Sequence, residues 1–218
     1  MVENFSRIIS EFTEVKENCP DLFIKKKEEE GTCIIRGNLS FDAVYDNKNQ
    51  IQDTFSIEIE IPADYPDKLP VVKETGGRIP LSMDNHIYTS IGKFCLGANF
   101  EVQDKFKKQP TLFGFIKNLV VPFLYSFCHK QKFGEMPYGE LAHGTEGIFQ
   151  YYKEKFQVES DDEVIKLLGF LAFTKFRGHH DCPCGSGKRL RNCHGDILIK
   201  MKDSNFDFRK DLVIIFNL

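Results

Sequence analysis

Three cysteines and a histidine lie close together near the C-terminus, in the segment DCPCGSGKRLRNCHG. Cys182 and Cys184 form a C-x-C pair, and Cys193 and His194 follow after eight intervening residues. Thiolates and imidazole are ligands that zinc prefers, and four of them complete its tetrahedral shell. A complete shell leaves no open position for a substrate, so the spacing predicts a structural zinc site.

The same segment contains GSGK, which is part of the pattern of a phosphate-binding loop. That loop needs a glycine five residues before Gly187, where Cys182 stands, and Ser or Thr after the lysine, where Arg189 stands. We therefore exclude a phosphate loop. The alternative to a metal site is a chance cluster of unrelated cysteines. His179 and His180 precede a ligand set that is already full, and we expect them to be solvated.

Residues 181–195 resemble the SEC-C motif, and all four metal ligands are present. The resemblance implies a zinc-stabilised interaction module found on many otherwise unrelated bacterial proteins, and it does not by itself name a function. Gly185 and Gly187 allow the backbone to turn sharply around the metal.

A separate cysteine, Cys95, lies in the glycine-containing stretch HIYTSIGKFCLGANF, nine residues after His86. The thiolate is the nucleophilic form, and a model thiol with a pKa of about 8.5 is slightly ionised at neutral pH. A thioester is an activated acyl donor, so an enzyme that carries one mainly has to position the incoming nucleophile. A coil position favours exposure and predicts a reactive thiol; the alternative is a buried structural cysteine.

Other candidate residues are weaker. Three further cysteines fall at helix ends or in apolar patterns and are expected to pack in the core: Cys19, Cys33 and Cys128. Glu101 and Asp104 either orient an attacking amine or belong to a solvated face. The basic stretch KFKKQ, residues 105–109, is expected to be a solvated loop, with partner contact as the alternative. His129 and His143 belong to no recognisable constellation.

Hydrophobic periodicity predicts the elements around these residues. Helices are expected at 3–17, 110–131, 145–157 and 160–176, with Pro110 in a first turn and a Ser160–Glu163 capping box. Strands are expected at 22–26, 32–45, 54–61 and 71–74, and again at the C-terminus, 211–218. Residues 76–100 are expected to be mostly irregular. This order predicts an α+β fold with an antiparallel sheet.

Residues 3–156 resemble the ubiquitin-conjugating (UBC-like) fold. The residues that carry the resemblance are Pro62, Tyr65, Pro66, Pro70, His86 and the Cys95 of GKFCLG, in that order after the strand meander. We therefore expect a UBC-like domain over 1–157 and a helical segment with the SEC-C zinc module over 158–218.

The resemblance implies that Cys95 accepts a ubiquitin-like protein as a thioester. His86 matches the histidine of the family's His-Pro-Asn tripeptide, but Ile87 and Tyr88 stand where Pro and Asn would be. The family uses that asparagine to stabilise the oxyanion when a lysine attacks. Asn85, a backbone amide or His86 itself could replace it, and the sequence leaves these alternatives open.

The divergent tripeptide resembles that of the bacterial branches of the conjugating-enzyme family, and the SEC-C tail also points to bacteria. Genes of those bacterial enzymes occur beside genes for activating enzymes, ubiquitin-like proteins and deconjugating proteases, often in antiphage defence operons. The resemblance therefore implies an activating enzyme and a ubiquitin-like protein as partners, with a protein target that the sequence does not name.

Composition limits the other classes of function. The chain has 218 residues, a net charge of -3 and a pI near 6.1, which argue against a general nucleic-acid binder. The run LVVPFLYSF, residues 119–127, is too short to span a bilayer, and the N-terminus reads as neither signal peptide nor anchor. Seven cysteines, three of them clustered, suit reduced thiols and predict the cytosol.

Three functions follow as hypotheses. The first is an enzyme that accepts a ubiquitin-like protein, or a target C-terminus, from an activating enzyme as a thioester on Cys95 and passes it to an acceptor. The second is an inactive UBC-like adaptor that only binds a ubiquitin-like partner, which the missing asparagine favours. The third makes the zinc tail the main recruitment module and the larger domain its scaffold.

Overall fold

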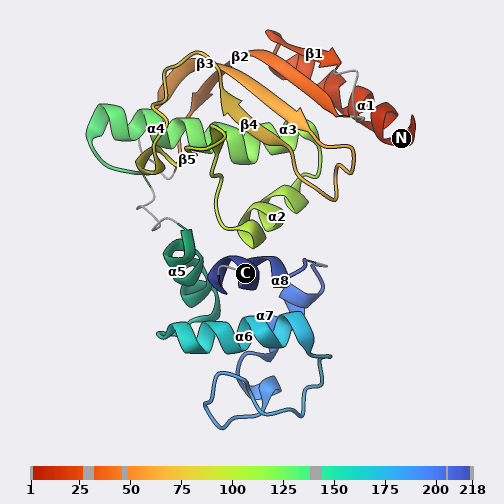
Figure 1. Cartoon of the computed structure of the whole chain (residues 1–218), viewed down its shortest axis with the longest axis vertical. Helices are drawn as coiled ribbons and strands as arrows, with labels where there is room; N and C mark the ends of the chain where they lie inside the picture. Colours follow the sequence, from red (N-terminus) through yellow and green to blue (C-terminus); the bar gives the residue numbers. More distant parts are fainter. Residues whose placement is uncertain (1, 27–31, 46–48, 138–143, 205, 217–218) are drawn as a thin grey trace. The chain divides into compact units, whose positions relative to one another are not determined.

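The computed structural model describes residues 2–26, 32–45, 49–137, 144–204 and 206–216. The chain forms two compact units, shown in Figure 1. Unit 1 comprises residues 1–96 and 105–139, and unit 2 comprises residues 97–104 and 140–218. The expected boundary at residue 157 lies inside unit 2, because residues 144–156 also belong to that unit.

Unit 1 contains an antiparallel sheet whose described strands follow the order β1-β2-β3-β4-β6-β5. The first four strands form the expected meander: β1 (Leu22–Lys26), β2 (Cys33–Ala43), β3 (Ile51–Ile61) and β4 (Val71–Glu74). In β3, Phe55, Ile57, Ile59 and Ile61 are all buried while their neighbours are less so. The period-two pattern therefore gives the sheet one buried face, as the sequence predicted.

Helices cover one face of this sheet (Figure 1). The helix α1 (Val2–Asn18) contacts β1 and α3 (Leu112–Phe115), which continues through a π-helical turn (Ile116–Val120) into α4 (Val121–Phe133). Thr111 caps this helix by accepting a hydrogen bond from the Gly114 N–H at 3.0 Å. Pro110 therefore lies before the helix, not in its first turn as expected, because the Thr111 side chain fixes the start.

By length and composition alone, the stretch Leu112–Phe133 could cross a membrane. However, 61% of its apolar window is buried inside the structure, where α4 packs on β2 and β3. Such burial is the behaviour of a core helix.

The segment before and after Cys95 is more regular than expected. It contains a short hairpin, β5 (Ile87–Tyr88) and β6 (Lys93–Phe94), and then the helix α2 (Asn99–Lys108). The stretch at 105–109, expected to be a loop, instead forms most of the last turn of α2, where Phe106 is only 3% exposed. A polar helix with few core positions leaves little periodicity to detect.

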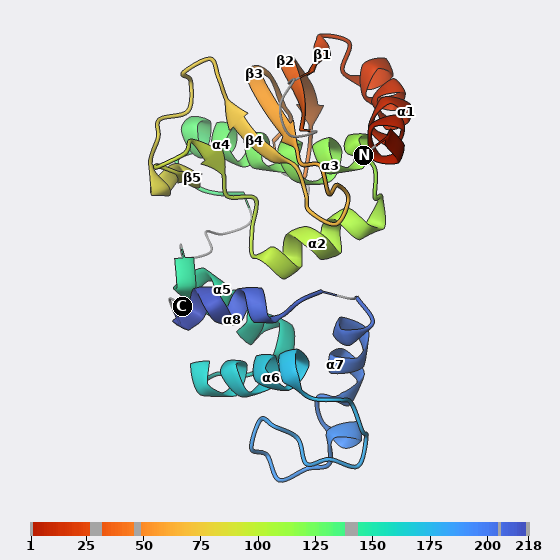
Figure 2. The same cartoon turned by 45° about the vertical axis from the view of Figure 1, so that its right-hand side comes forward.

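Unit 2 is helical, as Figure 2 shows. Its elements are α5 (Gly144–Phe156), α6 (Asp161–Phe173), the 3₁₀ turn η3 (Leu190–Asn192), α7 (Gly195–Lys202) and α8 (Arg209–Phe216). The capping box of Ser160 and Glu163 is present at the start of α6, as predicted. The expected C-terminal strand is wrong: Leu212 and Ile215 are buried while Val213 and Ile214 are exposed, which is a helical spacing.

Candidate functional site

Cys95 follows directly after β6, which lies in the sheet of unit 1 between β4 and the edge strand β5. Ile87 pairs with Phe94 and Tyr88 pairs with Lys93, so successive side chains of the hairpin point to opposite faces. Ile87 and Phe94 are 1% and 5% exposed and form the inner face. Cys95 is partly buried and lies outside regular structure.

Aromatic stacking fixes the hairpin to the core of unit 1. The ring of Phe94 stacks on the ring of Phe123 in α4, with centroids 4.1 Å apart and an interplanar angle of 16°. Offset stacking of this kind adds to the stabilisation from buried area. Cys95 therefore follows a residue whose position is fixed by packing.

His86 and Cys95 meet through their backbones. The Cys95 N–H donates a hydrogen bond to the His86 carbonyl at 2.7 Å, and His86 adopts a left-handed conformation with φ 53°. His86 also lines a cavity of about 30 Å³ together with Phe123 and Phe127, and Cys95 is not among its lining residues. The two residues that the sequence paired are thus neighbours in the backbone, and a chemical role for His86 stays a prediction.

Asn85, one suggested replacement for the missing asparagine, has a structural partner. Its side-chain amide donates to the Pro80 carbonyl at 3.1 Å and so ties the loop before the hairpin. Tyr88, which sequence reasoning treated only as a departure from the family pattern, is a diagonal neighbour of Cys95 across the hairpin. Burial, and next the hydrogen bond with Cys95, raise the pKa of the Tyr88 hydroxyl above its usual range.

The remaining thiols of unit 1 are buried, as predicted. Cys19, Cys33 and Cys128 are between 1% and 7% exposed. Burial raises the pKa of Cys128 to about 12, helped by the hydrogen bond that its thiol donates to Asp53 at 3.3 Å. A thiol that stays protonated and inaccessible is a poor nucleophile.

The four predicted metal ligands converge in unit 2. One ligand atom from each of Cys182, Cys184, Cys193 and His194 lies within 4.8 Å of all the others. The Cys184 and Cys193 sulfurs are 3.7 Å apart, and His194 Nδ1 is 3.2 Å from the Cys182 sulfur and 3.3 Å from the Cys193 sulfur. Tetrahedral zinc places sulfur pairs about 3.8 Å apart and a sulfur–nitrogen pair about 3.6 Å apart. The donor set and its spacing therefore fit a zinc ion.

The orientation of His194 also suits a ligand. Its Nε2 lies 3.0 Å from the Phe156 carbonyl, which can only accept, so Nε2 carries the proton. Nδ1 is then the unprotonated nitrogen, and it is the atom that faces the cysteine sulfurs. A hydrogen bond to the second ring nitrogen is the usual way in which proteins orient a metal-bound histidine.

A short loop holds the first two cysteines. An antiparallel bridge joins Asp181 to Arg189, and the Cys182 N–H donates to the Lys188 carbonyl at 2.8 Å. Gly185 and Gly187 have φ values of 85° and 71°, the left-handed region in which glycine is favoured. The sharp turn predicted around the metal is therefore present.

The ligands of the cluster belong to the core of unit 2. Cys182 and Cys184 pack with the buried residues of the helices, including Tyr152, Leu167 and Leu198. Burial raises the pKa of Cys184, but hydrogen bonds from Ser186 and the neighbouring thiols outweigh it and bring that pKa to about 6. The Cys184 thiol therefore loses its proton more readily than an ordinary thiol, and metal binding requires the deprotonated form.

A buried acid in unit 2 escaped sequence reasoning. Asp211, at 0% exposure in α8, accepts hydrogen bonds from the Tyr152 hydroxyl at 2.5 Å and from the Asn99 amide at 2.8 Å. Burial raises its pKa, although these donors oppose the rise. A lone aspartate before an apolar run matches no motif, so only the fold reveals it.

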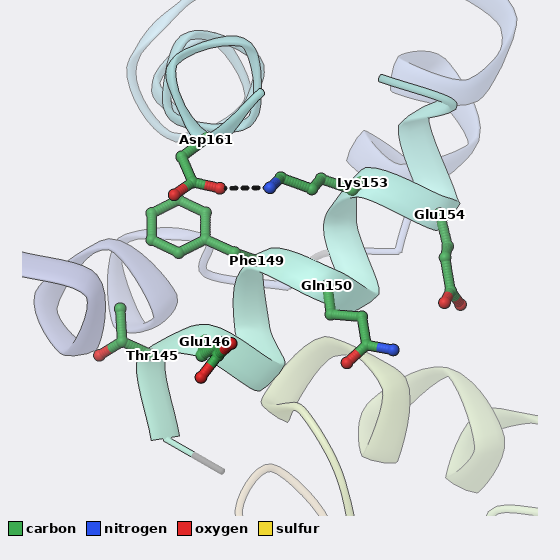
Figure 3. Close-up of a pocket in the computed structure, with 7 residues that line it drawn as sticks. All are labelled: Thr145, Glu146, Phe149, Gln150, Lys153, Glu154 and Asp161. Carbon is green, nitrogen blue, oxygen red and sulfur yellow. Dashed lines mark ion pairs between the residues drawn. The ribbon is translucent and has the colours of Figure 1, made fainter. Parts of the chain in front are cut away.

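Figure 3 shows an open hollow along α5 in unit 2, with a volume of about 690 Å³. Asp161 points toward Lys153 there, and the two form an ion pair at 2.6 Å. The other lining residues are Thr145, Glu146, Phe149, Gln150 and Glu154. Its lining residues include three carboxylates and one lysine, and none is a thiol or an imidazole.

Comparison with known families supports the metal cluster. Residues 181–196 match the family model of the SEC-C motif, a zinc-binding motif. The match covers the loop, all four ligands and the start of α7. No curated protein and no solved structure matches the chain.

Proposed function

We propose that this chain is a ubiquitin-conjugating-like enzyme that carries a ubiquitin-like protein, or a target C-terminus, as a thioester on Cys95. The observation that carries the proposal is the surroundings of Cys95, a partly exposed cysteine that follows a packed hairpin, while the other described cysteines of unit 1 are buried. A nucleophile needs this combination of access and fixed position.

The order of elements in unit 1 supports the same proposal. A first helix, a four-stranded antiparallel meander, a proline-containing connection and then the cysteine follow one another as in the UBC-like fold that the sequence resembles. Tyr65 in the connection is buried, and its hydroxyl donates to Glu11 of α1 at 2.7 Å. The proline-rich segment is thereby attached to the first helix.

The proposed reaction has two acyl transfers. First, the Cys95 thiolate attacks the thioester carbonyl of the charged activating enzyme; a new C–S bond forms, the old one breaks, and the enzyme's thiolate leaves. Then an acceptor amine attacks the Cys95 thioester, the C–S bond breaks, the electron pair returns to the Cys95 sulfur, and the amine loses its proton to solvent. The partners are therefore an activating enzyme, a ubiquitin-like protein and a protein target.

We further propose that the Cys182, Cys184, Cys193 and His194 cluster binds one structural zinc ion. Three thiolates and an imidazole fill the shell, so the ion would stabilise unit 2 and would not take part in acyl transfer. The chain's own contribution is to hold the ligands on the loop and on the N-terminal side of α7, and to orient His194 through Phe156.

Substitution of the nucleophile tests the enzyme proposal. Wild-type protein incubated with ATP, and with an activating enzyme and ubiquitin-like protein from the same source, should form an adduct that thiols cleave. Cys95→Ser should form a thiol-resistant oxyester instead, because a serine ester is less reactive than a thioester. The matched control is Cys33→Ser, which leaves Cys95 in place and should still give the thiol-sensitive adduct. If wild type binds the ubiquitin-like protein and forms no adduct, the protein is an adaptor.

A further inference from the structure

The outer face of the β5–β6 hairpin gathers three side chains that can act on one reaction. Tyr88 and Lys93 are paired across the two strands, and Cys95 follows two residues after Lys93 on the same side. The Lys93 ammonium lies 5.5 Å from the centre of the Tyr88 ring. In an antiparallel pair, the diagonal neighbour of Tyr88 is within reach of a long aromatic side chain, and that neighbour is Cys95.

The register brings the Tyr88 hydroxyl near the Cys95 thiol, and interaction with Cys95 adds to burial in raising the pKa of Tyr88. Tyr88 is 40% exposed, so the pair faces solvent and can be approached by a second protein. Because the pKa of Tyr88 is raised, the hydroxyl keeps its proton over the whole physiological range and acts as a donor to sulfur.

We propose that Tyr88 is a catalytic residue that donates a hydrogen bond to the Cys95 sulfur whenever that sulfur carries negative charge. This inference rests on the proposed acyl-carrier function, and it adds a hydrogen-bond donor for the Cys95 sulfur to that proposal. Charge is on sulfur in the attacking thiolate, and it returns to sulfur when the Cys95 C–S bond breaks and the acyl group leaves. Tyr88 keeps its own proton throughout, so no acid–base exchange is needed.

Lys93 has a supporting part. An ammonium near the ring of Tyr88 makes a cation–π contact that fixes the ring on the outer face of the hairpin. It also lies on the same face of the hairpin as Cys95. Lys93 is therefore a positioning residue for Tyr88.

The test measures the reaction of Cys95 with iodoacetamide, which needs no protein partner. At pH 7, Tyr88→Phe should react about two- to fivefold more slowly than wild type, because a lost hydrogen bond to sulfur lowers the thiolate population. At pH 10, where free thiols are ionised, the variant should react at least as fast, because its thiolate is no longer restrained by a donor. Mass spectrometry of the digested protein measures alkylation of the Cys95 peptide separately from that of the other cysteines.

The control is Ile91→Ala in the exposed turn of the hairpin, which should react like wild type at both pH values. Equal melting temperatures and zinc contents show that Tyr88→Phe has kept its fold. Equal rates for Tyr88→Phe and wild type at both pH values overturn the proposal, and so does the same slowing at both, which would indicate only altered access. A normal alkylation result with no acyl transfer from any activating enzyme would support the hydrogen bond and reject the conjugating function.

Discussion

At the scale of single residues, the thiols of this chain differ in what surrounds them. Cys128 is buried and donates to Asp53, and its raised pKa keeps it protonated. Cys95 lies at the surface of unit 1 with a tyrosine hydroxyl as its neighbour. The reactivity of a cysteine depends on its access to solvent and on the groups that stabilise its thiolate, and these differ between the two residues.

The metal ligands allow a prediction at the same scale. Purified protein should contain about one zinc ion per chain, because three thiolates and one imidazole form one closed shell. Replacing Cys182 and Cys184 together by serine should abolish zinc binding and lower the melting temperature of unit 2, since the ligands are part of its core. Metal analysis and thermal unfolding measure both effects.

Cys95→Ser is the matched control for this prediction, because it removes a thiol outside the cluster. It should retain the full zinc content and melt like wild type. Full zinc content in the Cys182→Ser, Cys184→Ser double variant would disprove the ligand assignment.

At the scale of elements, Asp211 links its own helix, α8, to two others. Its carboxylate accepts hydrogen bonds from Asn99 in the first turn of α2 and from Tyr152 in α5. Removing the acceptor would leave two donors without their partner, and an unpaired buried donor costs about 1–3 kcal/mol. The same burial raises the pKa of Asp211.

The raised pKa of Asp211 makes the stability of the protein depend on pH in a definite direction. Because the pKa of Asp211 is higher in the folded protein than in the unfolded chain, where it is about 3.9, folding favours the protonated acid. The contribution of Asp211 to the free energy of unfolding should therefore fall as pH rises from about 4 through the folded pKa. Asp211→Asn does not titrate, so the melting temperature of wild type relative to this variant should decline over that range.

Thermal unfolding at a series of pH values measures this difference, and effects common to both proteins, such as protonation of the metal ligands, cancel in it. The exposed Asp203→Asn variant should follow wild type at every pH. A constant difference between wild type and Asp211→Asn would show that Asp211 does not titrate differently on folding.

Elements with strong periodicity could be predicted from the sequence, and weakly patterned ones could not. The alternation in β3 and the cluster of predicted metal ligands can both be read from residues that are close in sequence. The structure confirms the buried face of β3 and the convergence of the four ligands. The run LVIIF in α8 fits a strand or a helix equally well, and packing of Leu212 and Ile215 decides for the helix. α2 was missed because its buried residues, Phe100 and Phe106, are six positions apart and serve different units.

At the scale of the whole molecule, the chain passes between its units more than once. Residues 97–104, which follow Cys95 almost directly, belong to unit 2, and the chain then returns to unit 1 at Lys105. Phe100 packs with Phe206 and Phe208, with ring centroids 5.4 and 5.1 Å away. The unit that contains the Cys182–His194 cluster therefore needs a segment that lies far from the SEC-C motif in sequence.

Two phenylalanines of the same helix make this testable. Phe100→Ala should destabilise unit 2 by about 3–5 kcal/mol, as expected for a large buried side chain, and should speed the loss of zinc to a chelator. Phe106→Ala removes an equally buried ring that packs with Tyr65 in unit 1, so it should leave the rate of zinc loss unchanged. Equal rates of zinc loss in the two variants would contradict the division of α2 between the units.

The central claim is that Cys95 carries the acyl group, and mapping the modified residue tests it most directly. The protein is incubated with ATP and with an activating enzyme and ubiquitin-like protein that belong together, then digested under acidic, thiol-free conditions and analysed by mass spectrometry. We predict that the acyl remnant lies on the Cys95 peptide and that hydroxylamine removes it. A remnant confined to another cysteine, or found only on lysines and resistant to hydroxylamine, would contradict the claim.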